Sequence, residues 1–158
     1  MATKYWLVKS EPSEFSIDDL AKSKHKTTYW DGVRNYQARN FMRDDMKLGD
    51  YVLYYHSNTD PTAVVGVCKV VKEGYPDFTA FDPDDKHYDP KSKKENPSWI
   101  MVDIKLVKKF KSPVTLVQIK ENPKLKEMRL VQRGNRLSVM PTAKKEFEVI
   151  LKMGGVSI

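Results

Sequence analysis

Residues 99–110 carry the most regular hydrophobic pattern of the chain, because every second side chain from Ile100 to Leu106 is aliphatic. This period of two predicts a β-strand with one buried face. We expect the opposite face to be the more solvated one, as in an antiparallel sheet with one wet side. That face consists of Trp99, Met101, Asp103 and Lys105.

Three further segments are rich in aromatic and β-branched residues, which favour strands. They are residues 5–8, 51–57 and 64–71. Gly66 lies inside the last of these, and an isolated glycine in a strand indicates a bulge or the close approach of another group.

Helices are expected to be short. Ser16 with Asp19 three residues later has the pattern of a capping box at a helix start. Two further short helices are predicted at residues 115–120 and 123–128, and residues 23–28 are expected to form a loop.

The last helix shows the clearest helical spacing, with Phe147 and Ile150 on one face. Thr142 is expected to cap its first turn, and Gly154 to take the C′ position after its last turn. Strands and short helices alternate without a βαβ rhythm, which predicts an α+β fold built on a curved, mostly antiparallel sheet. The length of 158 residues fits a single domain over residues 1–158.

The long segment at residues 74–97 is poor in aliphatic side chains and rich in Asp, Pro and Lys. A connection of this length in a compact domain is usually functional or mobile. We therefore treat residues 74–97 as a candidate functional segment, and whether it folds over a ligand is left open.

The net charge of +7 favours a polyanionic partner, nucleic acid first, although a merely soluble basic protein has the same charge. No apolar run is long enough for a transmembrane helix, and no secretory segment is present, so a cytoplasmic location is expected. Cys68 is expected to be a small core residue. Three isolated histidines and one cysteine give no metal-ligand spacing, so neither a metal nor a cofactor is predicted.

The stretch from residue 30 to residue 41 carries the most suggestive chemistry. A tryptophan precedes the turn signal Asp31-Gly32, and a helical run follows with two amides and with Arg39 and Arg43 one turn apart. Amides can read a base edge, an indole can stack on a base and guanidinium groups bind phosphate. The competing interpretation is an ordinary amphipathic helix with a solvated face.

Signals for catalysis are weak. Glycines form no phosphate-binding loop, no Gly-x-Ser-x-Gly elbow is present, and Cys68 has no evident histidine partner. His56 is a candidate general base with Asp103, but a structural histidine is the more common case.

Seven segments together resemble the EVE domain, a family of the PUA-like superfamily. They are YWLVKSEP at 5–12, SIDDL at 16–20, WDGVRNYQARN at 30–40, GDYVLYYHSN at 49–58, YDPKS at 88–92, NPSW at 96–99 and RLSV at 136–139. They occur in the expected order over nearly the whole chain, so the resemblance does not depend on one short motif.

This resemblance implies a twisted, β-barrel-like sheet flanked by helices, with a pocket similar to that of YTH domains, which hold a modified base in an aromatic cage. The family is associated with non-catalytic binding of modified nucleobases, such as 5-methylcytosine or 5-hydroxymethylcytosine in DNA, or bases in RNA. The chain resembles a free-standing prokaryotic, cytosolic member, or a nuclear one if its source is eukaryotic. A monomer is expected.

The resemblance also implies which residues form the base-binding pocket: Lys9, Ser10, Trp30, Arg34, Asn35, Asn40, His56, Ser57, Trp99 and Ser138. Phosphate contacts are assigned to Arg39, Arg43, Lys91, Lys93 and Arg133. Each has a simpler alternative, since buried tryptophans are common core residues and an asparagine often caps a helix.

Two alternative functions remain beside that of a modified-base reader. The pocket could bind a small nucleotide-like metabolite, in which case affinity would depend little on salt. The protein could also be a nucleic-acid-modifying enzyme that uses His56 with Asp103.

Overall fold

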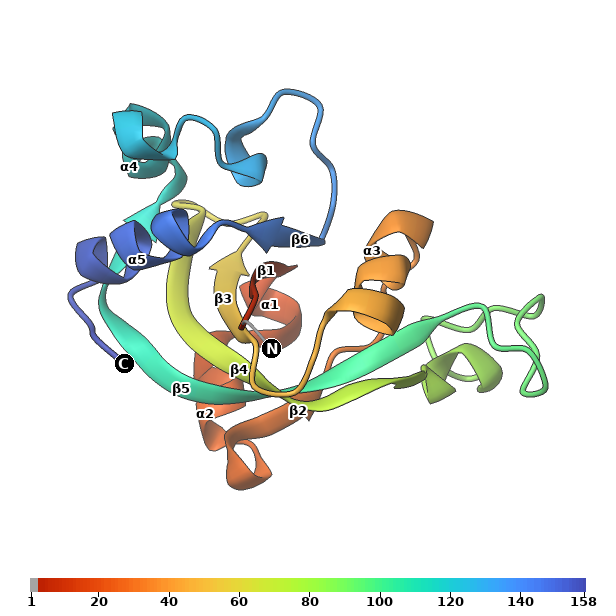
Figure 1. Cartoon of the computed structure of the whole chain (residues 1–158). Helices are drawn as coiled ribbons and strands as arrows, with labels where there is room; N and C mark the ends of the chain where they lie inside the picture. Colours follow the sequence, from red (N-terminus) through yellow and green to blue (C-terminus); the bar gives the residue numbers. More distant parts are fainter. Residues whose placement is uncertain (1–2) are drawn as a thin grey trace.

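The computed structural model describes residues 3–158, which form one curved six-stranded sheet with short helices around it (Figure 1). The strands are β1 (Tyr5–Ser10), β2 (Thr27–Tyr29), β3 (Tyr51–His56), β4 (Ala63–Pro76), β5 (Ile100–Thr115) and β6 (Val139–Thr142). The helices are α1 (Pro12–Phe15), α2 (Ile17–Lys22), α3 (Tyr36–Asn40), α4 (Leu116–Glu121) and α5 (Lys144–Met153).

The strand order is β2-β5-β4-β3-β1-β6. β1 runs parallel to β3, and every other neighbouring pair is antiparallel. The prediction of an α+β fold with a curved, mostly antiparallel sheet is therefore confirmed. The sheet stays open, because β2 and β6 form its two edges and do not pair with each other.

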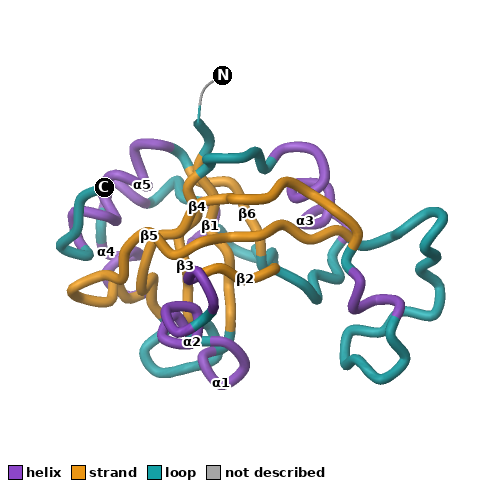
Figure 2. The backbone as a smooth tube through the Cα atoms, turned by 90° about the horizontal axis from the view of Figure 1, so that it is seen from below, coloured by secondary structure: helices purple, strands orange, loops and turns teal. Residues whose placement is uncertain are grey.

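The long strands β4 and β5 extend beyond the rest of the sheet as a two-stranded ribbon (Figure 2). Residues 77–99 connect their far ends and include the 3₁₀ turn Phe78–Phe81. The sequence marked residues 74–97 as a candidate functional segment, but residues 74–76 are the end of β4, and the connection extends to residue 99. The ribbon positions this connection beside α3 and the loop before that helix.

Buried side chains lie on both faces of the sheet at β1, since the three consecutive residues Trp6, Leu7 and Val8 are all buried and successive strand residues point to opposite faces. Cys68 is free and buried in β4, as predicted. The expectation of a wetter face on β5 is wrong at its start, since Met101 is fully buried and Trp99 nearly so. Tertiary contacts cover both faces there, and Trp99 stacks on Tyr36 of α3.

Gly66 confirms the expectation drawn from its position inside a strand. The register between β4 and β5 shifts between Val64 and Gly66. A side chain at residue 66 would collide with the tip of Ile17, so α2 packs directly on the sheet backbone at this point. The glycine therefore fixes how closely α2 approaches the sheet.

The capping box predicted for α2 is present, because Ser16 and Asp19 exchange backbone–side chain hydrogen bonds. α4 begins with a second capping box at Thr115, close to its predicted position. The predicted loop at residues 23–28 is partly wrong, since Thr27 and Thr28 belong to edge strand β2. The helix predicted at 123–128 is reduced to a 3₁₀ turn, Pro123–Leu125.

Both expected ends of the last helix are wrong by one residue. Thr142 pairs with Tyr5 as the last residue of β6, so Ala143 takes the N-cap position and its N–H donates to Glu146. At the other end Gly154 has a negative φ, and Gly155, with φ +74°, is the left-handed residue.

Asp50 joins the N-terminal strand to the turn before β3. Its buried carboxylate accepts hydrogen bonds from the Lys4 N–H (3.1 Å), the Trp6 indole N–H (3.0 Å) and the Lys47 N–H (2.9 Å). Three donors on one carboxylate offset the cost of burying its charge. The parallel β1–β3 pairing begins at this point, with Tyr5 opposite Tyr51.

We expect Asp50→Ala to lower the free energy of unfolding by about 3 kcal/mol, because it leaves buried donors without an acceptor. Urea unfolding at neutral pH measures the change. Asp44→Ala is the matched control, since Asp44 is exposed and pairs only with neighbouring Arg43. Equal unfolding midpoints for the two variants would contradict the role given to Asp50.

Candidate functional site

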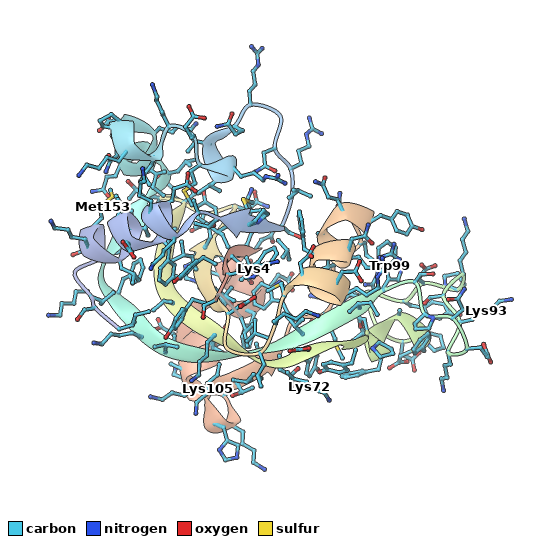
Figure 3. All side chains as sticks on the ribbon, viewed as in Figure 1. Lys4, Lys72, Lys93, Trp99, Lys105 and Met153 are labelled. Atoms are coloured by element: carbon cyan, nitrogen blue, oxygen red, sulfur yellow. The ribbon has the colours of Figure 1, made fainter. Side chains whose placement is uncertain are left out.

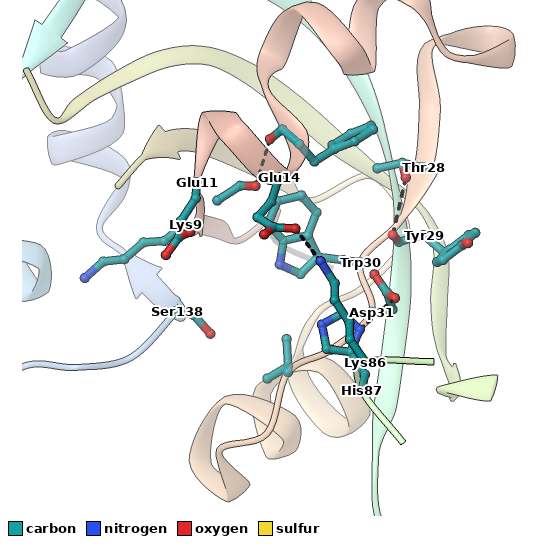
Figure 4. A pocket seen from close by; sticks show the side chains of 14 residues that line it. Lys9, Glu11, Glu14, Thr28, Tyr29, Trp30, Asp31, Lys86, His87 and Ser138 are labelled. Carbon is teal, nitrogen blue, oxygen red and sulfur yellow. Dashed lines mark hydrogen bonds and ion pairs between the residues drawn. The ribbon is translucent and has the colours of Figure 1, made fainter. Parts of the chain in front are cut away.

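A cavity of about 560 Å³ lies where the end of β1, helix α1 and the segment before α3 meet residues 86–87 (Figure 4). Its wall combines one buried indole with hydroxyl, carboxylate, ammonium and imidazole groups. The lining residues are Lys9, Ser10, Glu11, Glu14, Phe15, Thr28, Tyr29, Trp30, Asp31, Gly32, Val33, Lys86, His87 and Ser138.

Four of the ten residues assigned to a base pocket line this cavity: Lys9, Ser10, Trp30 and Ser138. Lys9 and Ser138 are joined by a backbone hydrogen bond of 2.9 Å from the Lys9 N–H to the Ser138 carbonyl. Burial lowers the pKa of the Lys9 ammonium. The sequence segments 9–10 and 138, far apart in the chain, therefore form one wall.

Trp30 belongs both to the core and to the cavity wall. It is 8% exposed, and its ring packs edge-on against Tyr54 at 5.4 Å between ring centroids. Its backbone N–H donates to the Val102 carbonyl at 2.7 Å, which extends the β2–β5 pairing by one bond. The indole is therefore held rigidly while its remaining surface lines the cavity.

Trp99 and Arg34 lie outside the cavity lining and stack on each other. The Arg34 guanidinium lies 5.2 Å from the Trp99 ring centroid, and Tyr36 stacks on the indole at 4.9 Å. The Trp99 N–H donates to Asp89 at 2.6 Å. These contacts give Trp99 a bracing role between α3 and residues 77–99 (Figure 3).

The other four predicted pocket residues also lie outside the lining; three of them form hydrogen bonds through their side chains, and the fourth through its backbone. Asn35 caps α3 by accepting from the Ala38 N–H, and Asn40 accepts from Arg39. His56 accepts from the Ile17 N–H at 3.1 Å, and burial lowers its pKa, which favours the neutral imidazole that this bond requires. The Ser57 N–H donates to the Ser10 carbonyl. A role for them in base binding stays a prediction.

Sequence reasoning missed most of the charged groups in the cavity. Asp31 is visible in the sequence only as part of a turn, while Glu14, Lys86 and His87 carry no motif of their own. The available signal is the aliphatic-poor segment 74–97, which supplies Lys86 and His87. Which of its residues face the cavity depends on the course of the β4–β5 ribbon.

The charges in the cavity are mixed. Lys86 pairs with Glu14 of α1, and this ion pair links residues 77–99 to α1 across the cavity (Figure 4). The His87 Nδ1 lies 3.3 Å from an Asp31 oxygen and 3.4 Å from an Asp85 oxygen, without the geometry of a hydrogen bond to either. Burial raises the pKa of the Asp31 carboxyl. A ligand here can find both donors and acceptors.

Gly32 permits the close packing of this wall. Its φ is +76°, and a Cβ atom at this position would lie 2.5 Å from the His87 ring. Both the left-handed backbone and the contact with the imidazole therefore require glycine. The turn recognised in the sequence thus has a second purpose, which is to place the His87 ring against the backbone.

Asp77 holds the two halves of the wall together and was not singled out from the sequence. Its fully buried carboxylate accepts from the Gly32 N–H (2.8 Å), the Arg34 guanidinium (3.0 Å) and the Thr79 N–H (2.9 Å). Burial alone raises the pKa of Asp77, but hydrogen bonds from the Thr79 hydroxyl, the Gly32 N–H and Arg34, together with the Arg34 charge, outweigh it and leave the pKa below its ordinary value.

The five residues assigned to phosphate binding do not form one patch. Arg39 donates to Asn40 and to the Ser98 carbonyl, and Arg43 forms a two-bond pair with Asp44. Exposed Lys91 and Lys93 lie in residues 77–99, where Figure 3 places Lys93 at the far end of the molecule. Arg133 lines a separate groove. Their phosphate contacts stay a prediction.

The structure does not bring His56 and Asp103 together as a catalytic pair. His56 is paired with Ala63 of β4, whereas Asp103 is paired with Lys72 near the other end of that strand, about 30 Å away along it. Within residues 3–158 no cluster of His, Cys, Asp and Glu is arranged to hold a metal ion. The same residues contain no helix long and apolar enough to cross a membrane.

The pattern that defines the EVE domain family matches residues 4–153. The chain belongs to the EVE domain family. Human thymocyte nuclear protein 1 is 43% identical to this EVE domain over 168 residues, which cover 96% of this chain and 74% of the relative.

Two solved structures extend the family likeness to the fold. The human THYN1 protein in complex with 5-methylcytosine-containing DNA superposes with a TM-score of 0.91 at 42% identity, covering 99% of this EVE domain and 100% of that chain. A hypothetical protein from Leishmania major has a TM-score of 0.91 at 50% identity, covering 98% and 96%.

We expect Asp77→Asn to destabilise the protein by about 2–4 kcal/mol near neutral pH, because the anion no longer serves its donors. The folded-state pKa of Asp77 lies below the unfolded value of about 3.9. Its stabilising effect is therefore present above that value and lost as the pH falls through the folded pKa.

Urea unfolding of both proteins from about pH 7 to about pH 3 measures this difference. The stability gap between wild type and variant should shrink on acidification. Asp84→Asn, at an exposed position in the same segment, is the control and should leave the profile unchanged. A gap that stays constant down to the lowest pH would contradict the role of the Asp77 carboxylate.

Proposed function

We propose that this EVE domain is a non-catalytic DNA-binding module that recognises a modified cytosine, turned out of the helix, in the cavity beside Trp30. The observation that carries the proposal is the cavity of about 560 Å³, with an indole and several hydrogen-bonding groups in its wall. Its family membership supports DNA as the carrier, since a human relative was solved in complex with 5-methylcytosine-containing DNA.

The size and chemistry of the cavity suit a single base. Ligand pockets usually measure about 300–1,000 Å³ and combine an apolar wall with a few polar groups. A flipped base is typically read through its Watson–Crick edge and held by stacking. Trp30 supplies the flat apolar surface, while the Asp31 carboxylate can accept from an exocyclic amino group and the Ser138 hydroxyl can donate to a ring acceptor.

A modified-base reader needs no catalytic group, so none of these residues carries out a chemical step. The Asp31 carboxylate can accept a hydrogen bond from the exocyclic amino group of cytosine or adenine. Thymine and uracil carry a carbonyl oxygen in place of that amino group, so they suit this acceptor less well. RNA is the alternative carrier, and a small nucleotide-like metabolite is the alternative ligand. We propose that the protein acts where it meets nucleic acid, which is the cytoplasm or, if its source is eukaryotic, the nucleus.

The test compares binding of oligonucleotides with and without 5-methylcytosine or 5-hydroxymethylcytosine, in single- and double-stranded form, at two salt concentrations. We expect tighter binding of modified DNA and a decline in affinity as salt rises. Matched RNA and free nucleotides are included. Binding of a nucleotide with no salt dependence and no oligonucleotide binding would replace the proposal with the metabolite alternative.

Trp30→Phe tests whether this cavity is the binding site. We expect it to weaken binding of the preferred base a few-fold, because phenylalanine keeps an aromatic face but loses part of the indole's stacking surface, and complete loss of stacking costs about 1–3 kcal/mol per base. Phenylalanine is preferred to alanine, because removing the buried indole would cost about 3–5 kcal/mol of stability. Fluorescence anisotropy gives the affinities.

Trp99→Phe is the matched control, since it makes the same change at a buried tryptophan outside the cavity lining. Thermal unfolding of both variants confirms that each is folded. Equal loss of selective binding in the two variants, or no loss in Trp30→Phe, would place the base elsewhere.

A further inference from the structure

A second concave surface adjoins the cavity and has a different charge. It is a groove of about 430 Å³ between α3 and residues 129–137, here called the arginine groove. Arg129, Arg133 and Arg136 line it together with Gln37 of α3. In Figure 1 residues 129–137 descend toward β6 and pass beside α3.

The arginine groove contains positive charge without compensating carboxylates. All three arginines are exposed, and no Asp or Glu is among the residues that line the groove. None of the ion pairs found within residues 3–158 involves them. Arg39 and Arg43, which the sequence analysis assigned to phosphate binding together with Arg133, are instead engaged by neighbouring side chains.

The loop carrying these arginines is held by its own amide side chains. The Asn135 amide donates to the Arg129 carbonyl at 2.7 Å, and its oxygen accepts from the Leu137 N–H at 3.1 Å. Gly134, with φ +80°, makes the turn between Arg133 and Asn135. The backbone that carries the arginines is thus held by hydrogen bonds within the turn. Binding of a ligand therefore has to order the arginine side chains but not the backbone.

The arginine groove and the cavity adjoin each other at two separate chain segments. Leu137 lines the groove, and the next residue, Ser138, lines the cavity. On the facing side Val33 lines the cavity and Asn35 the groove. A strand that places one base beside Trp30 can therefore continue directly into the groove.

We propose that the arginine groove binds the sugar–phosphate backbone of the strand whose base enters the cavity; this rests on the proposed function. The cavity wall mixes Glu11, Glu14 and Asp31 with Lys9 and Lys86, and Lys86 is paired with Glu14, so the uniformly positive surface that suits a phosphate backbone lies in the neighbouring groove. Guanidinium groups bind phosphate oxygens through paired, charge-assisted hydrogen bonds. The cavity then supplies base selectivity, and the groove supplies affinity without selectivity.

The double variant Arg133→Ala/Arg136→Ala tests this division. Both side chains are exposed, so the fold should be retained. We expect affinity to fall about tenfold for modified and unmodified DNA alike, so that their ratio is unchanged. The slope of log K against log salt should become shallower by about 0.7–0.9 for each phosphate that the variant no longer neutralises.

Lys105→Ala/Lys145→Ala is the matched control, because it removes the same charge from exposed positions outside the groove. Equal affinity and salt slope in the two double variants would overturn the groove assignment. A loss of base selectivity with an unchanged salt slope would also overturn it. Failure of the wild-type protein to bind any oligonucleotide would instead overturn the proposed function itself.

Discussion

The buried carboxylate of Asp77 is the contact on which the rest of the site depends. It accepts hydrogen bonds from Gly32, Arg34 and Thr79, and so joins the loop before α3 to the far end of the β4–β5 ribbon. The same loop packs Gly32 against the His87 ring and donates from Arg34 to the His87 carbonyl, so Asp77 fixes the backbone from which both contacts are made. One side chain thus converts two irregular segments into a rigid wall, at the cost of burying a charge that needs all its partners.

The three tryptophans have three different structural roles: one lies in the core, one joins two segments and one lines the cavity. Trp6 is a core residue whose indole N–H is satisfied by Asp50. Trp99 donates to Asp89 and lies in a stack with Tyr36 and Arg34. Only Trp30 lines the cavity. A buried indole needs one hydrogen-bond partner and a flat neighbour, and these requirements are met equally by bracing contacts and by a ligand site.

Charge is divided between two adjoining surfaces in a way that net charge alone would not indicate. The cavity mixes carboxylates with lysines and a histidine, whereas the arginine groove is lined by arginines and amides. Mixed polarity suits recognition of an uncharged base edge, and uniform positive charge suits a phosphate backbone. The overall basic character of the chain is therefore less informative than the place where its carboxylates are absent.

The sequence by itself determined the α+β class, the family, the first capping box and the tight approach at Gly66, because each depends on local spacing or on an ordered set of segments. It also identified Lys9, Ser10, Trp30 and Ser138, which line the cavity. Only the tertiary structure decided that Asp31, Lys86 and His87 join them while Trp99 braces α3. The physical reason is that the ribbon of β4 and β5 carries residues 77–99 back to the loop before α3, and contacts between segments so distant in the chain leave no local pattern in the sequence.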